Sequence, residues 1–149
     1  MRNGVGVKIK KVHSLIRKSI HNSETFKQNE ELTNMIGWTI GFISRRSVEE
    51  LETYQKDIER EFKISRSTAT GHLQNMERLG YIYREVSLID NRLKRIVLTE
   101  KSIELHNKVI STFDGIEDRL LSGFNSHEKE LLFSFLLRLE QNLEDKGEF

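Results

Sequence analysis

Hydrophobic residues recur every three or four positions over most of the chain, which is the period of an amphipathic helix. Near the N-terminus, Val5, Ile9, Val12, Ile16 and Ile20 form one such apolar stripe. A stripe this narrow, with no earlier element to pack on, needs a later helix or a second chain as its partner. Residues 32–46 are so densely apolar that we expect them to form a central, nearly enclosed helix. Its core-forming residues are Met35, Ile36, Trp38, Thr39, Ile40, Phe42 and Ile43.

A short helix is predicted from about Thr53 to Phe62. Tyr54, Ile58 and Phe62 share one face, and Thr53 is the expected N-cap because its hydroxyl can accept a first-turn N–H. Ile64 follows as an apolar anchor. The next polar residues then start a second helix after only a short turn.

The second helix is predicted to begin after Ser65, the next N-cap residue. Ala69, Leu73 and Met76 recur on one face and are expected to be buried. Gly80 ends the helix, because glycine readily adopts the left-handed conformation found at helix C-termini.

β-prone residues fill positions 81–86 and 93–98, separated by the polar tip SLIDNR, so we expect a β-hairpin. The last third returns to helix, with a break near residues 123–126 and Ser126 capping the final helix. The chain has no proline among its 149 residues, which favours helical structure. We therefore expect a single domain, mainly α with a small β-hairpin wing: a winged helix-turn-helix with N- and C-terminal dimerisation helices.

The outward face of the second helix is small and polar. With the stripe at Ala69 facing the core, a step of about 100° per residue sets the opposite face. That face carries Ser67, Gly71, Gln74 and Arg78, flanked by Arg66 and Thr70. Short side chains allow close approach to a major groove, and Gln can pair with adenine. The alternative is an ordinary solvent-facing helix whose outward residues happen to be small.

The hairpin places Arg92, Lys94 and Arg95 just after its turn. A cationic tip beside a groove-reading helix can place an Arg in a neighbouring minor groove, whose potential favours guanidinium. Asp90 can hold Arg92 in register. The alternative is a solvated hairpin with an incidental ion pair worth under about 1 kcal/mol.

Residues 55–101 resemble the multiple antibiotic resistance regulator (MarR) family of bacterial repressors. The segment QKDIEREFKISRSTATGHLQNMERLGYIYRE is similar to the family's helix-turn-helix, and DNRLKRIVLTEKS to its wing signature. The resemblance implies a homodimer with intertwined terminal helices, recognition helices in successive major grooves and wings in minor grooves. It also implies, as in many members, a small phenolic or lipophilic effector under the central helix.

By position, the resemblance implies that Arg92 is the minor-groove residue, oriented by Asp90. Gly71 stands where many members place a larger, often basic residue, so fewer base contacts are expected there. Ser102 replaces the usual glycine after the Leu-Thr pair, which should affect the start of the following helix. The predicted DNA site comprises Arg66, Ser67, Thr68, Thr70, Gly71, Gln74, Asp90, Arg92 and Lys94.

Charge is segregated along the chain although its net value is +1. Residues 1–20 carry a net +6 and residues 60–98 a net +4, whereas residues 21–59 carry −4 and residues 99–149 carry −5. A basic central segment fits a local contact with a polyanion, and it also fits a mixed solvated surface.

Composition excludes several classes of protein. With 36% hydrophobic and 32% charged residues, the chain should fold without a membrane, and no run is long enough to span one. It lacks a secretory signal pattern, so we expect it in the cytoplasm. No cysteine means no disulfide, thiolate nucleophile or iron–sulfur site.

The terminal helices present more apolar surface than one small domain can hide, which usually marks an interface. We expect residues 1–30 and 103–149 to form a helical dimerisation region and residues 31–102 the DNA-binding region. A twofold dimer predicts an inverted-repeat operator with half-sites one helical turn, about 10 bp, apart.

The remaining chemistry is sparse. The five histidines lack metal-binding spacing, so no metal or other cofactor is predicted. No nucleophile elbow, phosphate loop or dinucleotide turn occurs, so no enzyme is expected. A pocket for an aromatic anion is a further hypothesis, with Trp38 for stacking and Arg17 for pairing. Its lining would be His13, Arg17, Met35, Trp38 and Phe42. The alternative is that Trp38 is core and Arg17 solvated.

The sequence thus predicts a homodimeric, DNA-binding transcriptional repressor, with release by a small ligand as an added hypothesis. The rival from another class is a winged-helix protein-interaction module that binds no DNA. Salt distinguishes the two, because Lys and Arg release phosphate counterions when they bind DNA. An enzyme on this scaffold would need turnover, and we assign no residues to it.

Overall fold

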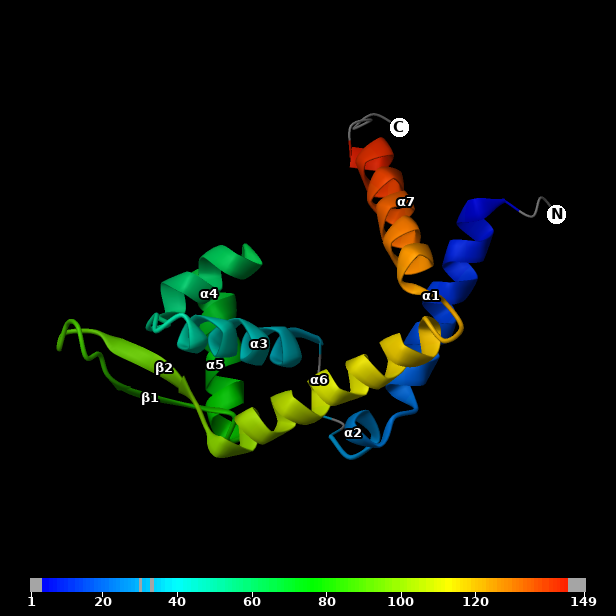
Figure 1. Cartoon of the computed structure of the whole chain (residues 1–149). Coiled ribbons are helices and arrows are strands. Elements are labelled where there is room, and N and C mark those ends of the chain that lie inside the picture. The colour runs from blue at the N-terminus through cyan, green and yellow to red at the C-terminus, as the bar shows by residue number, and fades with distance from the viewer. Residues whose placement is uncertain (1–3, 30, 33, 145–149) are drawn as a thin grey trace. The chain divides into compact units, whose positions relative to one another are not determined.

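The core is centred on α3 (Asn34–Val48), the helix that the density of apolar residues predicted. The computed structural model describes residues 4–29, 31–32 and 34–144 and divides into two units, residues 1–113 and 114–149. The other described elements, seen in Figure 1, are α1 (Val5–His21), α2 (Glu24–Lys27), α4 (Gln55–Phe62), α5 (Arg66–Arg78), β1 (Ile82–Val86), β2 (Lys94–Leu98), α6 (Glu100–Leu120) and α7 (Ser126–Glu144). The predicted helices and hairpin are confirmed, and the short α2 was not predicted.

One face of α3 supplies the core. Ile36, Ile40 and Ile43 are at most 2% exposed and cluster with Ile58 of α4. Trp38 is 65% exposed, so the expectation of a nearly enclosed helix was wrong. The reason is the helical step: a residue two positions from Ile36 points about 200° away from it.

The helix-turn-helix is formed by α4 and α5. The N-cap of α4 is Tyr54 rather than the expected Thr53, and the Asp57 carboxylate accepts a hydrogen bond from the Tyr54 N–H at 2.8 Å. Thr53 lies one position before the N-cap, so its hydroxyl does not cap the helix. It accepts a hydrogen bond from Arg46 Nε at 3.2 Å instead. Lys63 ends α4 at φ 51°, the left-handed conformation that closes the turn.

The predicted signals of α5 are confirmed. The Ser65 hydroxyl accepts from the Thr68 N–H at 3.1 Å, and Ala69, Leu73 and Met76 are fully buried. Gly80 follows the helix at φ 75°, a conformation that a β-carbon would disfavour.

The wing is an antiparallel pair in which Ile82 faces Leu98 and Val86 faces Lys94. At the start of α6, Ser102 is fully buried and its hydroxyl donates to the Tyr81 carbonyl, so the serine joins the wing to α6. Within the described residues, no helix has the length and apolar character needed to cross a membrane.

In the second unit, α7 is capped by Asn125 and not by the expected Ser126. Asn125 Oδ1 accepts from the Glu128 N–H at 2.9 Å, and the Glu128 carboxylate accepts from the Asn125 N–H at 2.8 Å. This reciprocal pair is a capping box with asparagine in the place of Ser or Thr.

Leu73→Ala should lower the free energy of unfolding by about 2–5 kcal/mol, because it leaves a cavity in the core. The matched control is Val48→Ala, which removes an aliphatic side chain that is 83% exposed and should change stability by less than about 0.5 kcal/mol. Urea denaturation at one fixed protein concentration measures both values. Equal losses would contradict the burial of Leu73.

Candidate nucleic-acid interface

The face of α5 opposite its buried stripe is open to solvent. Arg66, Ser67, Gly71 and Gln74 are all exposed, as the sequence predicted from the helical step, and so is Thr68, which the family resemblance added. At Gly71 a β-carbon would meet no atom within 4 Å, so the chain itself does not require glycine there. The residue keeps this face flat.

Hydroxyl groups gather at the start of α5. The Ser65 oxygen lies 3.0 Å from the Ser67 oxygen and 2.8 Å from the Thr68 oxygen. The free N–H groups and the dipole of a helix N-terminus favour an anion, and the exposed Arg66 adds a cation beside them. These groups together can bind a phosphate.

The Thr70 hydroxyl forms hydrogen bonds within the chain. Its hydroxyl donates to the Arg66 carbonyl at 2.8 Å and accepts from Gln55 Nε2 at 2.9 Å. Because the only hydroxyl proton of Thr70 is donated to the Arg66 carbonyl, Thr70 could donate to a DNA phosphate only if that bond broke.

His72 joins α5 to α3. The Thr39 hydroxyl donates to the Met35 carbonyl at 2.8 Å and therefore accepts from His72 Nε2, which lies 2.9 Å away. Burial lowers the pKa of His72, so the ring is neutral at pH 7. This bond adds a polar contact between α5 and α3 to the apolar packing of the two helices.

At the wing, Arg92 and Asp90 form a bidentate pair. Arg92 Nε and Nη2 donate to the two Asp90 carboxylate oxygens, each at 3.0 Å, and the Arg92 side chain remains 85% exposed. Lys94 is exposed as well. Arg95 turns inward instead and pairs with Glu85 and, at 3.6 Å, with Glu52.

Solved structures of bacterial regulators match nine tenths or more of the chain. MarR from Oenococcus oeni PSU-1, a transcription regulator, is 31% identical, and the match covers 93% of this chain and 99% of that one with a TM-score of 0.56. The chain belongs to the MarR family. S. aureus MepR bound to ethidium bromide is 26% identical over 94% of this chain and 96% of that one, with a TM-score of 0.78. The S. aureus MepR–DNA complex is 27% identical over 90% and 96%, with a TM-score of 0.74.

A curated relative matches a shorter part of the chain. The uncharacterised helix-turn-helix-type transcriptional regulator YybA of Bacillus subtilis is 26% identical over 95 residues. The match covers 64% of this chain and spans 63% of the length of YybA. No family model matches the sequence.

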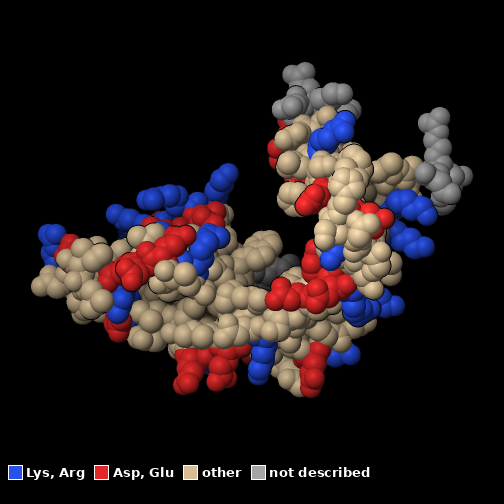
Figure 2. Space-filling model, viewed as in Figure 1, with Lys and Arg blue, Asp and Glu red and all other residues tan. Residues whose placement is uncertain are grey.

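Further cations lie beside the predicted MarR-family DNA site. Lys56, Arg60 and Lys63, on α4 and the turn that follows it, are exposed. Figure 2 shows Lys and Arg side chains gathered over α4, with others near the hairpin. Sequence reasoning did not select these three residues, although the net charge of residues 60–98 was a signal for the last two.

The residues proposed for an effector pocket are dispersed between surface and core. His13, Arg17 and Trp38 are exposed, and Met35 is half-buried. Phe42 is buried, with its ring edge-on to Phe62 at 6.1 Å between centroids. An effector site in this MarR-family protein that uses all five side chains stays a prediction.

Arg92 holds the pKa of the Asp90 carboxyl below its ordinary value of 3.8. The hydrogen bonds from its guanidinium contribute most, and the hydrogen bond from its backbone N–H adds to them. The folded pKa is the depressed one, so the pair persists at higher pH and is lost as pH falls through that lowered value. Arg92→Ala should raise the Asp90 pKa toward 3.8, measured by NMR titration of the side-chain carboxyl. The matched control is Lys94→Ala, and an Asp90 pKa that Arg92→Ala left unchanged would contradict the pairing.

Proposed function

We propose that this MarR-family protein is a homodimeric, sequence-specific DNA-binding transcriptional regulator acting on an inverted-repeat operator. The observation that carries the proposal is the exposed small and polar face of α5 beside the exposed cationic wing. The S. aureus MepR–DNA complex, a structure similar to this chain, supports it.

In this proposal α5 enters the major groove. Gln74 reads a base edge, with adenine as its best partner, while Arg66, Ser67 and Thr68 bind phosphates or base edges near the helix start. Arg92 enters the adjacent minor groove, and Asp90 fixes its direction. A dimer bound across a promoter would block transcription, so we propose repression.

The dimer is proposed from apolar surface on the terminal helices. Neither α1 nor α7, each described over its whole length, has a buried residue. Val5, Val7 and Leu15 on α1, and Phe133 and Leu143 on α7, are each more than half exposed. Surface of this extent is normally covered by another chain, and a twofold dimer would give each half-site the same contact.

Release by a small lipophilic or aromatic ligand belongs to the same proposal. MepR has been solved with ethidium bromide, which supports a comparable site here. The relatives are transcriptional regulators, so we propose no enzymatic activity and place the protein with the DNA in the cytoplasm.

Binding to DNA selected from a random pool should weaken steeply with salt, because bound Lys and Arg release counterions. Arg92→Ala should weaken binding at all sequences and lower the slope of log K against log salt by about 0.9. Gln74→Ala should instead change the preference at one base position, by about 1–3 kcal/mol. Lys108→Ala, at an exposed cation outside the proposed site, is the control and should leave affinity and preference unchanged. Binding that ignores salt, or no binding at all, would favour the protein-interaction alternative.

Leu136→Glu combined with Leu139→Glu should shift the protein from dimer to monomer, because two charges on an apolar face of α7 cannot be desolvated at an interface. Both leucines are more than one third exposed in the single chain. Arg138→Glu on the same helix changes the net charge equally and is the control. Sedimentation velocity measures the mass, and an unchanged dimer in the double variant would exclude this face from the interface.

A further inference from the structure

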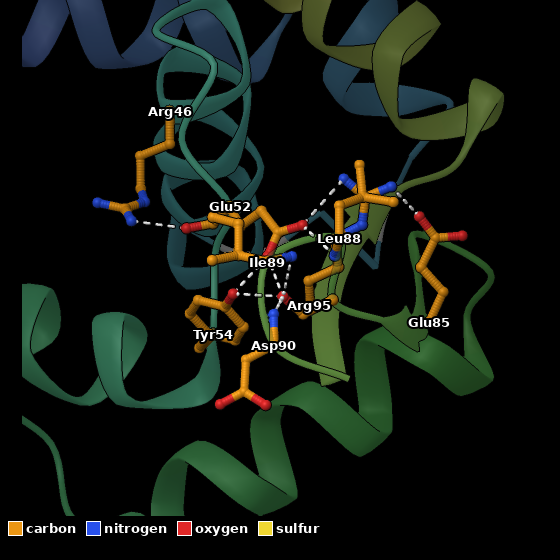
Figure 3. A network of polar contacts seen from close by, with 9 residues as sticks. Arg46, Glu52, Tyr54, Glu85, Leu88, Ile89, Asp90 and Arg95 are labelled. Atoms are coloured by element: carbon orange, nitrogen blue, oxygen red, sulfur yellow. Dashed lines mark hydrogen bonds and ion pairs between the residues drawn. The ribbon is translucent and has the colours of Figure 1, made fainter. Parts of the chain in front are cut away.

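An almost fully enclosed carboxylate lies beneath the wing. The Glu52 side chain is 7% exposed and lies between α3 and α4. It accepts hydrogen bonds from the hydroxyls of Tyr54 and Ser87 and, at 2.7 Å, from the Leu88 N–H, and it pairs with Arg95 at 3.6 Å (Figure 3). A buried charge is tolerated only when its hydrogen-bonding capacity is satisfied in this way.

These contacts keep Glu52 ionised. Burial alone would raise the pKa of Glu52, but the hydrogen bonds from Ser87, Tyr54 and the Leu88 N–H, together with the charge of Arg95, outweigh burial and lower the pKa below its ordinary value. The carboxylate is therefore an acceptor for all its partners at neutral pH.

The same network fixes the backbone of the wing tip. The Ser87 oxygen accepts from the N–H groups of Ile89 and Asp90, each at 3.1 Å. Asp90 in turn accepts from the Arg92 N–H through its carboxylate at 3.0 Å, and from the Leu93 N–H through its carbonyl at 2.9 Å. An isolated two-stranded hairpin is only marginally stable, so these bonds decide the shape of the tip.

The network also joins the wing to the helices behind it. Arg46 of α3 donates to the Glu52 carbonyl at 2.7 Å. The Ile96 N–H of β2 donates to the Thr53 carbonyl at 2.7 Å, immediately before α4. The wing tip is therefore held in a fixed relation to the helix-turn-helix.

Two aliphatic side chains project from this fixed tip. Leu88 is 79% exposed and Ile89 is 82% exposed, although their N–H groups are bound by the network. The exposed Arg92 lies in the same turn. Proteins that bind the minor groove set leucine or isoleucine against base steps and place guanidinium groups in the groove.

We propose that the wing tip is a preorganised minor-groove contact in which Leu88 and Ile89 lie against the groove beside Arg92, and that Glu52 is the positioning residue that fixes it. The proposal rests on the DNA-binding function proposed above. Because the tip is already hydrogen-bonded, little conformational entropy is lost when it binds.

The first test replaces both aliphatic side chains, Leu88→Ser with Ile89→Ser, and measures affinity for the selected DNA over a range of salt. We expect binding to weaken about tenfold with an unchanged salt slope, because apolar contacts release no counterions. Val48→Ser, at an aliphatic residue that is 83% exposed outside the wing, should bind like the unaltered protein. An unchanged affinity of the double variant, or a change in its oligomeric state alone, overturns the proposal.

The second test uses Glu52→Ala, which should weaken binding about tenfold, with Glu52→Gln intermediate. Removing a negative charge close to bound DNA should by itself strengthen binding, whereas the positioning role of Glu52 predicts that binding weakens. Glu61→Ala removes an exposed carboxylate from α4 and is the control, with affinity unchanged or tighter.

Coupling between the two changes separates positioning from general stability. In the background of the double serine variant, Glu52→Ala should cost less than about twofold, since the contact that it positions is already gone. Equal losses in both backgrounds overturn the role of Glu52. Failure of the unaltered protein to bind DNA overturns the proposed function; binding by the unaltered protein that neither variant weakens overturns only this inference.

Discussion

The burial of Ala69, Leu73 and Met76 is the interaction on which the arrangement depends. These side chains pack in the core built around α3 and are fully buried. Any rotation of α5 about its own axis would expose them. Since about 100° separates successive residues, the position of this stripe also decides which side chains face solvent. The open face of α5 is therefore a consequence of core packing, and the bond between His72 and Thr39 secures it.

The tip of the wing depends on a different kind of interaction. The base of the hairpin packs in the core through Ile82, Ile96 and Leu98. Its tip is supported by a buried charge, Glu52, that connects residues before α4 to the hairpin. A buried carboxylate favours one arrangement of its neighbours, because any other arrangement would leave it without hydrogen-bond partners. Apolar packing thus positions α5 and the base of the wing in one core, whereas hydrogen bonds fix the tip of the wing.

The terminal helices carry apolar stripes that remain exposed in the single chain. The stripe on α1 and the apolar residues of α7 have no buried members in the single chain. Their periodicity is as clear as that of α3, and the difference lies in what covers them. A chain of this size can enclose only one core, and the surplus apolar surface is what makes a second copy a physical expectation.

Much of the fold could be predicted from local signals: the periodic stripes, Ser65 as an N-cap, Gly80 at a helix end and the β-prone hairpin. These are short-range features, because a residue's neighbours within one turn decide its helical face and its cap. The exposed α5 face followed from the same reasoning. The exposure of Trp38 also follows from the helical step once Ile36 is known to be buried. The cap at Tyr54 and the inward turn of Arg95 do not follow from it, and no periodic signal distinguishes Glu52 from other acidic residues. Glu52 and Ser87 are 35 positions apart, and only the folding of the wing onto the segment before α4 brings them together. Local sequence determined the elements and their faces, whereas tertiary structure decided which polar groups became partners, because such pairing depends on turns and packing that lie far apart along the chain.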